Sequence, residues 1–321
     1  MNQSYGLIMN IRKRLFSIYK ASVRILAGHR IGELYSVGVV HRFLVSSLKP
    51  DFVTIQGHRM FLDSKDSLRL SIFPYEPFQT ELAKKEIKKG DTVLDIGANI
   101  GYYALIFAKL VGEEGKIFAF EPDPDNFALL KKNVEINGYR NVILVPKAVT
   151  NKTGKIRLYL SDYNKGDHRI YDSHDGRNST EIEAIRLDDY FKNYNGRIDF
   201  IKMDIQGAEG GVIQGMPLLL QKTKNLKIAT EFWPAGLKRF GIQPEGYLKL
   251  LLKRGFKLYH IDEQEKKIEP VNIRKLLDMC TPSKLRVYKD TGGKYDTGKG
   301  QKKKDFTDLL DFTTLLCVKE K

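Results

Sequence analysis

A glycine turn and a following acid are the residues of this chain best arranged for chemistry. Asp95, Gly97 and Gly101 lie in the run Val93-Leu-Asp-Ile-Gly-Ala-Asn-Ile-Gly-Tyr-Tyr, where a short apolar strand bends into a helix-like pattern. Such a turn places backbone N–H groups and the positive end of a helix beside a ligand. Glu121 ends the next strand, twenty residues after Gly101, where an acid can accept hydrogen bonds from ribose hydroxyls. We therefore expect a ligand with an adenosine-like ribose.

The spacing of the turn argues against a phosphate ligand. Its glycines follow G-x-x-x-G, whereas a dinucleotide cradle has G-x-G-x-x-G, and the chain has no G-x-x-x-x-G-K-[ST] pattern. Asp95 in the turn would repel a pyrophosphate and attract an ammonium group. S-adenosylmethionine (SAM) carries a ribose, an ammonium and a sulfonium, and no phosphate. We predict a SAM site made of Asp95, Gly97, Asn99, Gly101, Glu121 and Ala148. A turn that only packs closely, without a ligand, is the alternative.

The elements around these residues alternate between strands and helices, which is typical of a parallel sheet. The pattern predicts a first core strand that begins at 93, further strands at 116–120, 141–145, 198–203, 226–230 and 257–261, and a returning strand at 313–318. Two period-2 runs, 155–160 and 181–186, flank a polar loop. Ligands of open α/β sheets bind outside the carboxyl ends of the strands. Asp95, Glu121, Asp204 and Glu231 all fall at predicted strand ends, so we expect them to converge on one cleft.

Four motifs, taken in order, resemble those of the FkbM family of SAM-dependent methyltransferases. They are the Val93–Tyr103 run, Phe120-Glu-Pro-Asp-Pro, Lys202-Met-Asp-Ile-Gln-Gly-Ala-Glu and Glu231-Phe. The resemblance covers about residues 75 to 275. It implies a Rossmann-like class I methyltransferase sheet of seven mostly parallel strands, the last antiparallel, and methylation of a hydroxyl on a sugar or polyketide-like acceptor. Many relatives have Glu where this chain has Gln206, which removes one carboxylate from the site.

Methylation of an alcohol needs a group that takes the hydroxyl proton. Asp204 and Glu231 are the candidates, and a carboxylate that only caps a loop is the alternative for each. In the polar loop, His168 could act as a base near neutral pH and Arg169 could bind an acidic or hydroxylated acceptor. The remaining histidines show no ligand spacing with one another, so we expect no metal, although a metal bridging Asp204 and Glu231 is an alternative.

The net charge of +15 is concentrated in the flanks of the chain. Residues 1–89 carry a net charge of +8 and residues 281–305 carry +5. Residues 8–26 predict a helix with an apolar stripe and a basic border, which suits an anionic membrane surface or a partner subunit. Short strands are expected at 37–45, 52–55 and 59–62. We divide the chain into a basic N-terminal α/β extension, residues 1–75, and a methyltransferase domain, residues 76–321, with a flexible lysine-rich insertion at 288–305.

The rest of the composition bears on the compartment and the competing functions. No apolar run approaches the ~18 to 20 residues that span a bilayer, and Cys280 and Cys317 form no metal or disulfide framework. We therefore expect a cytoplasmic protein, peripheral at the membrane if the N-terminal helix binds lipid. An RNA 2′-O-methyltransferase, with Lys302–Lys304 meeting phosphates, is one alternative, although we do not expect a nucleic-acid partner. A non-catalytic module that binds SAM is another.

Overall fold

The computed structural model describes residues 3–26, 52–64, 66–162, 164–279 and 312–320. These residues belong to two compact units, which divide between Tyr75 and Glu76. The first contains α1 (Gln3–Leu26) and a hairpin of β1 (Val53–Ile55) and β2 (His58–Met60). The predicted strand at 37–45 and insertion at 288–305 lie outside the described residues. Among the described residues, every helix is too short or too polar to span a lipid bilayer.

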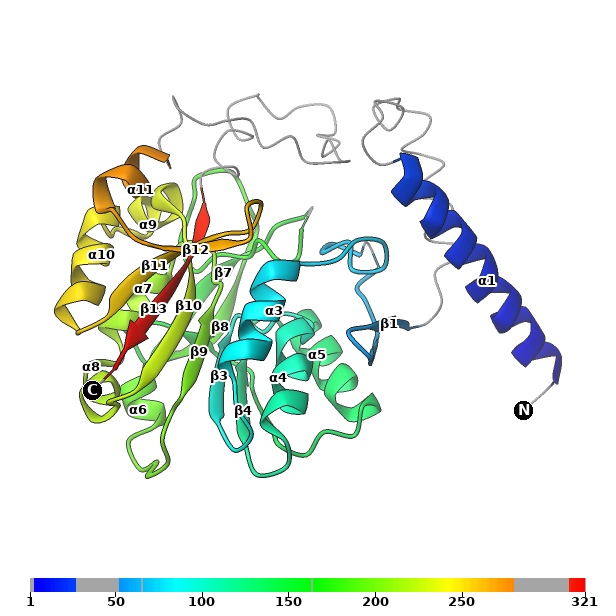
Figure 1. Cartoon of the computed structure of the whole chain (residues 1–321), viewed down its shortest axis with the longest axis horizontal. Helices are drawn as coiled ribbons and strands as arrows, with labels where there is room; N and C mark the ends of the chain where they lie inside the picture. Colours follow the sequence, from blue (N-terminus) through cyan, green and yellow to red (C-terminus); the bar gives the residue numbers. More distant parts are fainter. Residues whose placement is uncertain (1–2, 27–51, 65, 163, 280–311, 321) are drawn as a thin grey trace. The chain divides into compact units, whose positions relative to one another are not determined.

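The second unit is built on an eight-stranded sheet with the order β12-β11-β13-β10-β9-β3-β4-β5 (Figure 1). Its strands are β3 (Thr92–Ile96), β4 (Lys116–Phe120), β5 (Val142–Val145), β9 (Phe200–Met203), β10 (Leu226–Phe232), β11 (Lys257–Asp262), β12 (Lys267–Pro270) and β13 (Thr313–Lys319). β5, β4, β3, β9 and β10 are parallel, and β13 lies antiparallel between β10 and β11. The seven predicted strands are present, and the last is antiparallel. The count of seven was too low, because the polar turn at 263–266 lets β12 pair with β11 as an eighth strand at the edge.

Helices cover both faces of this sheet (Figure 1). One layer holds α3 (Pro77–Glu86), α4 (Tyr102–Val111) and α5 (Pro124–Ile136), and α4 contacts both of the others. The other holds α6 (Leu187–Tyr190), α7 (Glu209–Gln214), α8 (Pro217–Lys222), α9 (Pro234–Phe240), α10 (Pro244–Lys253) and α11 (Ile273–Met279), whose buried residues share one apolar cluster with the strands. A strand buried on both faces reads as a continuous apolar run, which explains the composition of β3 and β4.

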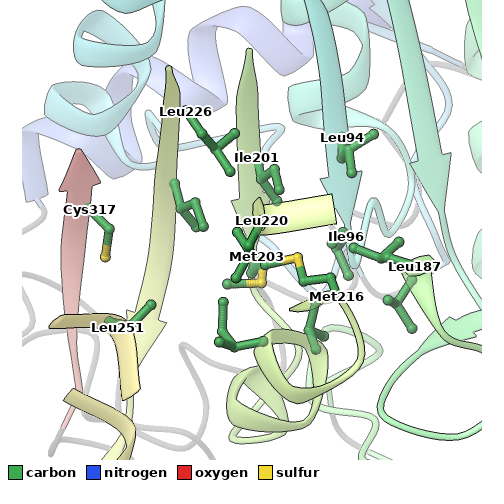
Figure 2. Close-up of a cluster of buried hydrophobic side chains, with 14 of the residues drawn as sticks. Leu94, Ile96, Leu187, Ile201, Met203, Met216, Leu220, Leu226, Leu251 and Cys317 are labelled. Carbon is green, nitrogen blue, oxygen red and sulfur yellow. The ribbon is translucent and has the colours of Figure 1, made fainter. Parts of the chain in front are cut away.

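The core beneath the second layer joins residues that are distant in sequence (Figure 2). Leu94, Ile201 and Leu226 of three neighbouring strands and Cys317 of β13 pack with side chains of α8 and α10. Their burial is the main stabilising term, at roughly 25 cal/mol per Å² of apolar surface removed from water. It fixes the strands that carry the predicted acids.

The two period-2 runs form a separate small sheet. β7 (Gly154–Tyr159) and β8 (Ser179–Ile185) pair antiparallel, and the short β6 (Ala148–Val149) runs parallel to β8. The polar loop between β7 and β8 begins at Leu160 and carries His168 and Arg169. The hairpin therefore presents that loop as a unit.

Candidate functional site

The first of two pockets opens at the carboxyl ends of β3, β4 and β9. The space between its lining residues, including the part that is open to solvent, is about 540 Å³. Six of the predicted site residues line it, namely Gly97, Asn99, Glu121, Ala148, His168 and Asp204. We call this pocket 1. The convergence of strand-end acids is thus realised for Glu121 and Asp204.

The glycine turn makes the floor of pocket 1 through close backbone contacts. Gly97 has φ of 84°, and a Cβ added there would lie 2.1 Å from the carbonyl oxygen of Asp204. Only glycine combines that conformation with that approach. Gly101, with φ of 95°, precedes α4 and packs on Leu130, but it does not line pocket 1. The turn therefore brings the end of β3 directly against the end of β9.

Glu121 is held at the wall of pocket 1 by the backbone. Its Oε2 accepts a hydrogen bond from the Asn99 N–H at 2.8 Å, and its Oε1 accepts one from the Asp123 N–H at 2.9 Å. Burial raises the pKa of Glu121 to about 7, although these hydrogen bonds oppose the rise. The carboxylate keeps free lone pairs for hydroxyl donors.

Part of the lining of pocket 1 is apolar. Ala148, Val149, Leu158 and Ile170 come from the small sheet and its loop. An acid and an apolar part of the lining fit the ribose and the flat base of an adenosine group. The residues that line pocket 1 therefore fit the adenosine part of SAM.

Asp95 does not lie in the turn, as the sequence suggested, but inside β3. Its side chain is buried, and its Oδ2 has no hydrogen-bond partner. Burial raises its pKa to about 7, and the nearby Lys202 opposes that rise. Asp95 lines neither pocket. Asp95 and Ile96 both keep their pairing with β4, so the strand continues through the residue that the sequence placed in the turn.

A second pocket lies at the same edge of the sheet, and we call it pocket 2. The space between its lining residues, including the part that is open to solvent, is about 250 Å³. Its polar lining consists of Glu76, Gln79, Lys202, Asp204, Glu231 and Thr314. Asp204 is the residue that lines both pockets. Its Oδ2 accepts from Lys202 Nζ at 3.3 Å and its Oδ1 accepts from Gln206 Nε2 at 3.0 Å. Both of its oxygens are therefore fixed in orientation.

Glu231 lies within β10 and not at its end, because that strand continues through Phe232 in its pairing with β13. One carboxylate oxygen, Oε2, is buried without a hydrogen-bond partner. Burial, reinforced by repulsion from Asp204 and Glu209, raises its pKa well above the ordinary value. Glu231 therefore lines pocket 2 with one carboxylate oxygen that has no hydrogen-bond partner.

Sequence reasoning missed Glu76, Tyr103 and Lys202 as parts of the site. The Tyr103 hydroxyl donates to Glu76 Oε2 at 2.7 Å, and Lys202 Nζ lies 4.5 Å from the Tyr103 ring centroid. A lysine inside the apolar run 198–203 was a signal for Lys202, because lysine is seldom buried unless it is paired. Glu76 precedes the first core strand by many residues, and nothing local marked it.

The two residues predicted in the polar loop differ in their surroundings. His168 lines pocket 1, and its Nδ1 accepts from the Ser161 N–H at 3.0 Å, so the neutral ring carries its proton on Nε2. Burial lowers the pKa of His168, although Asp123 and Asp167 oppose this. Arg169 lines neither pocket: it is buried, paired with Asp167 at 2.9 Å and placed over the Trp233 ring. Its contacts are those of a residue that holds the loop together.

No metal-binding group is evident in the described part of the chain. There, no set of three or more His, Cys, Asp and Glu side chains is arranged to hold a metal ion. Lys202 Nζ lies beside Asp204 in pocket 2 and supplies the positive charge at that wall.

Comparison with known proteins places this site in a family. Residues 95–258, just over half of the chain, match the methyltransferase FkbM domain. The chain belongs to the FkbM methyltransferase family. The matched stretch includes Glu121, Asp204 and Glu231, while Glu76 precedes it. The FkbM domain thus supplies pocket 1 and most of pocket 2.

Two curated relatives are similar over a large part of the FkbM chain. The hexuronic acid methyltransferase AglP of Haloferax volcanii is 28% identical over 174 residues, which are 53% of this chain and 65% of AglP. The 2-O-methyltransferase NoeI of Sinorhizobium fredii is 32% identical over 156 residues, 43% of this chain and 62% of NoeI. The match therefore spans less than two thirds of either relative.

Among solved structures, the methyltransferase FkbM of Methylobacillus flagellatus is similar over 56% of this chain and 46% of that one. The identity is 15% and the TM-score is 0.36.

Proposed function

We propose that this chain is a SAM-dependent O-methyltransferase that binds SAM in pocket 1 and a hydroxyl-bearing acceptor in pocket 2. The observation that carries the proposal is the position of Asp204, whose side chain lines both pockets. A group at that wall can contact the donor and the acceptor together. Membership in a methyltransferase family and the ribose-compatible acid Glu121 support the same reading.

The proposed reaction is an in-line displacement. SAM supplies a methyl group on a sulfonium, and the acceptor oxygen forms a bond to the methyl carbon as the carbon–sulfur bond breaks. The hydroxyl proton passes to the Asp204 carboxylate, and the products are a methyl ether and the neutral thioether S-adenosylhomocysteine. Holding the two reactants in line contributes up to ~7 to 11 kcal/mol in favourable cases. Glu231, with its unpartnered Oε2, would hold the acceptor through a hydrogen bond.

For the acceptor we propose a sugar or a related polyhydroxylated small molecule. AglP and NoeI, both similar to this chain, are described as a hexuronic acid methyltransferase and a 2-O-methyltransferase. The acceptor pocket offers carboxylates, a lysine, an amide and a hydroxyl, groups that suit hydroxyl ligands.

The proposed function predicts binding of SAM and S-adenosylhomocysteine but not of NAD. Titration calorimetry on the full chain measures this. Transfer of a radiolabelled methyl group from SAM to a panel of neutral, amino and acidic sugars then tests the acceptor class. Failure of SAM to bind at millimolar concentration would contradict the proposed function. The chain would then have the methyltransferase fold without methyltransferase activity.

We also propose that α1 binds an anionic membrane surface. The helix has five basic residues and no acidic ones, and its side chains Ile11, Leu15 and Ile18 are exposed at helical spacing on one face. Basic residues around an exposed apolar stripe are typical of helices that lie at a lipid interface.

The prediction for α1 is salt-sensitive sedimentation with vesicles that contain anionic lipid, and none with neutral vesicles. Replacing Ile11, Leu15 and Ile18 together by serine should abolish sedimentation, and deleting residues 1–26 should leave SAM affinity within a few-fold. Absence of salt-sensitive binding would exclude the membrane and favour a partner subunit. If the deletion abolished SAM binding in a folded protein, the domain boundary near residue 75 would be wrong.

A further inference from the structure

Lys202 is a buried cation in the lining of pocket 2. It lies on β9 with 8% of its surface exposed. Its Nζ is 3.3 Å from Asp204 Oδ2 and 4.5 Å from the centroid of the Tyr103 ring. A lysine gains little from burial unless its charge is paired, so this position has a specific electrostatic cause.

Carboxylates from four different elements surround this lysine. Asp95 comes from β3, Glu231 from β10, Asp204 from the end of β9, and Glu76 from the residue before α3. Glu209 of α7 adds a fifth carboxylate, which faces Asp204 and Glu231. Oxygens of Asp95, Glu209 and Glu231 are buried without hydrogen-bond partners. The cluster thus contains buried carboxylate oxygens that no hydrogen bond satisfies.

The pKa shifts of the carboxylates and of Lys202 are both consistent with a lysine that offsets their negative charge. Burial raises the pKa of Glu76, of Asp95 and of Glu231, and attraction to Lys202 opposes the rise in all three. Burial alone would lower the pKa of Lys202, but attraction to Asp204, Glu76 and Asp95 outweighs it, so the lysine pKa is raised. Lys202 is therefore charged at neutral pH.

We propose that Lys202 is a positioning residue, which orients the Asp204 carboxylate at the wall between the pockets and offsets the negative charge of the carboxylates around it. The inference rests on the proposed function for its effect on turnover. Lys202 acts through the carboxylates and takes no proton from the acceptor.

The test is the pH dependence of methyl transfer by Lys202→Met, Lys202→Gln and Lys202→Arg. An opposite charge within ~4–6 Å moves a carboxyl pKa by about 1 to 3 units. We therefore expect the acidic limb of the turnover profile to move at least about one unit higher in Lys202→Met. Turnover should fall about tenfold or more at pH values below that limb and recover at higher pH. Lys202→Gln keeps a donor to Asp204 but loses the charge, so its limb should move as well, whereas Lys202→Arg should keep the limb near its wild-type position.

The matched control is Lys227→Met. Lys227 lies on the neighbouring strand and forms an ion pair with Glu86, and it lines neither pocket. Its removal should leave the pH profile unchanged. The proposal would be overturned if Lys202→Met and Lys202→Gln lowered turnover to the same extent at every pH and left the acidic limb in place. Lys202 would then have only a structural role.

A second measurement separates this inference from the proposed function. Carbon-13 NMR of glutamate carboxyl carbons, with the Glu231 resonance assigned by Glu231→Gln, follows titration in the protein without ligand. Lys202→Gln should raise the titration midpoint of Glu231 relative to wild type, and an unmoved midpoint would overturn the role of Lys202. If the wild-type enzyme transferred no methyl group while this midpoint moved, the proposed function would fail and the charge balance would stand.

Discussion

Asp204→Asn should lower turnover by about 10²- to 10⁴-fold, the range that general base catalysis contributes. The amide has nearly the same shape as the carboxylate but cannot take the acceptor proton. Because the substitution preserves packing at the wall shared by the two pockets, SAM affinity should stay within a few-fold. Turnover with an identified acceptor and calorimetry with SAM measure the two effects separately.

Two further variants serve as comparisons for Asp204→Asn. Glu231→Gln keeps a hydrogen-bonding group in pocket 2, so we expect a smaller loss of turnover than in Asp204→Asn. His168→Ala should have the smallest effect on proton removal, because Nδ1 already accepts from the Ser161 N–H. Wild-type turnover in Asp204→Asn would show that the base is another group, or that orientation alone suffices.

Glu121→Ala should weaken SAM binding by about 10- to 150-fold, which corresponds to the roughly 1.5 to 3 kcal/mol of a hydrogen bond to a charged group. Glu121 lines pocket 1, and its carboxylate is already fixed by the N–H groups of Asn99 and Asp123. It therefore needs little reorganisation to accept the ribose hydroxyls. Titration calorimetry with SAM measures the change.

The control for Glu121→Ala is Glu135→Ala on α5. Glu135 is exposed and lies 3.9 Å from Lys131, so its loss should leave SAM affinity unchanged. Because Glu121 also accepts from the turn, thermal unfolding of each variant should be measured beside affinity. Unchanged affinity in folded Glu121→Ala would remove the ribose assignment and leave the rest of pocket 1 to be tested.

The sequence predicted elements well where one local pattern specifies both the strand and its end. The second core strand has the bounds Lys116–Phe120, as expected, because an apolar run is followed by Glu121 and the Pro122 and Pro124 residues that stop it. Glu121 and Asp204 reach one pocket because carboxyl ends of parallel strands meet at one edge of the sheet. The predicted positions of Asp95 and Glu231 were wrong by a short distance, because sheet pairing carries both strands past the polar residue.

What the sequence determined by itself is therefore the order of strands and helices, the glycine turn and the family, since periodicity and turn chemistry depend on near neighbours. Tertiary structure decided which distant groups meet. Leu316 of β13 pairs with Ala229 and with Tyr259, and no local pattern specifies either partner. The same packing brings Glu76 and Lys202 to the wall that Asp204 shares between the pockets. The protonation state of a buried ionisable group depends on the groups that surround it. Those groups come from separate elements of the chain, so only the folded structure shows which of them meet.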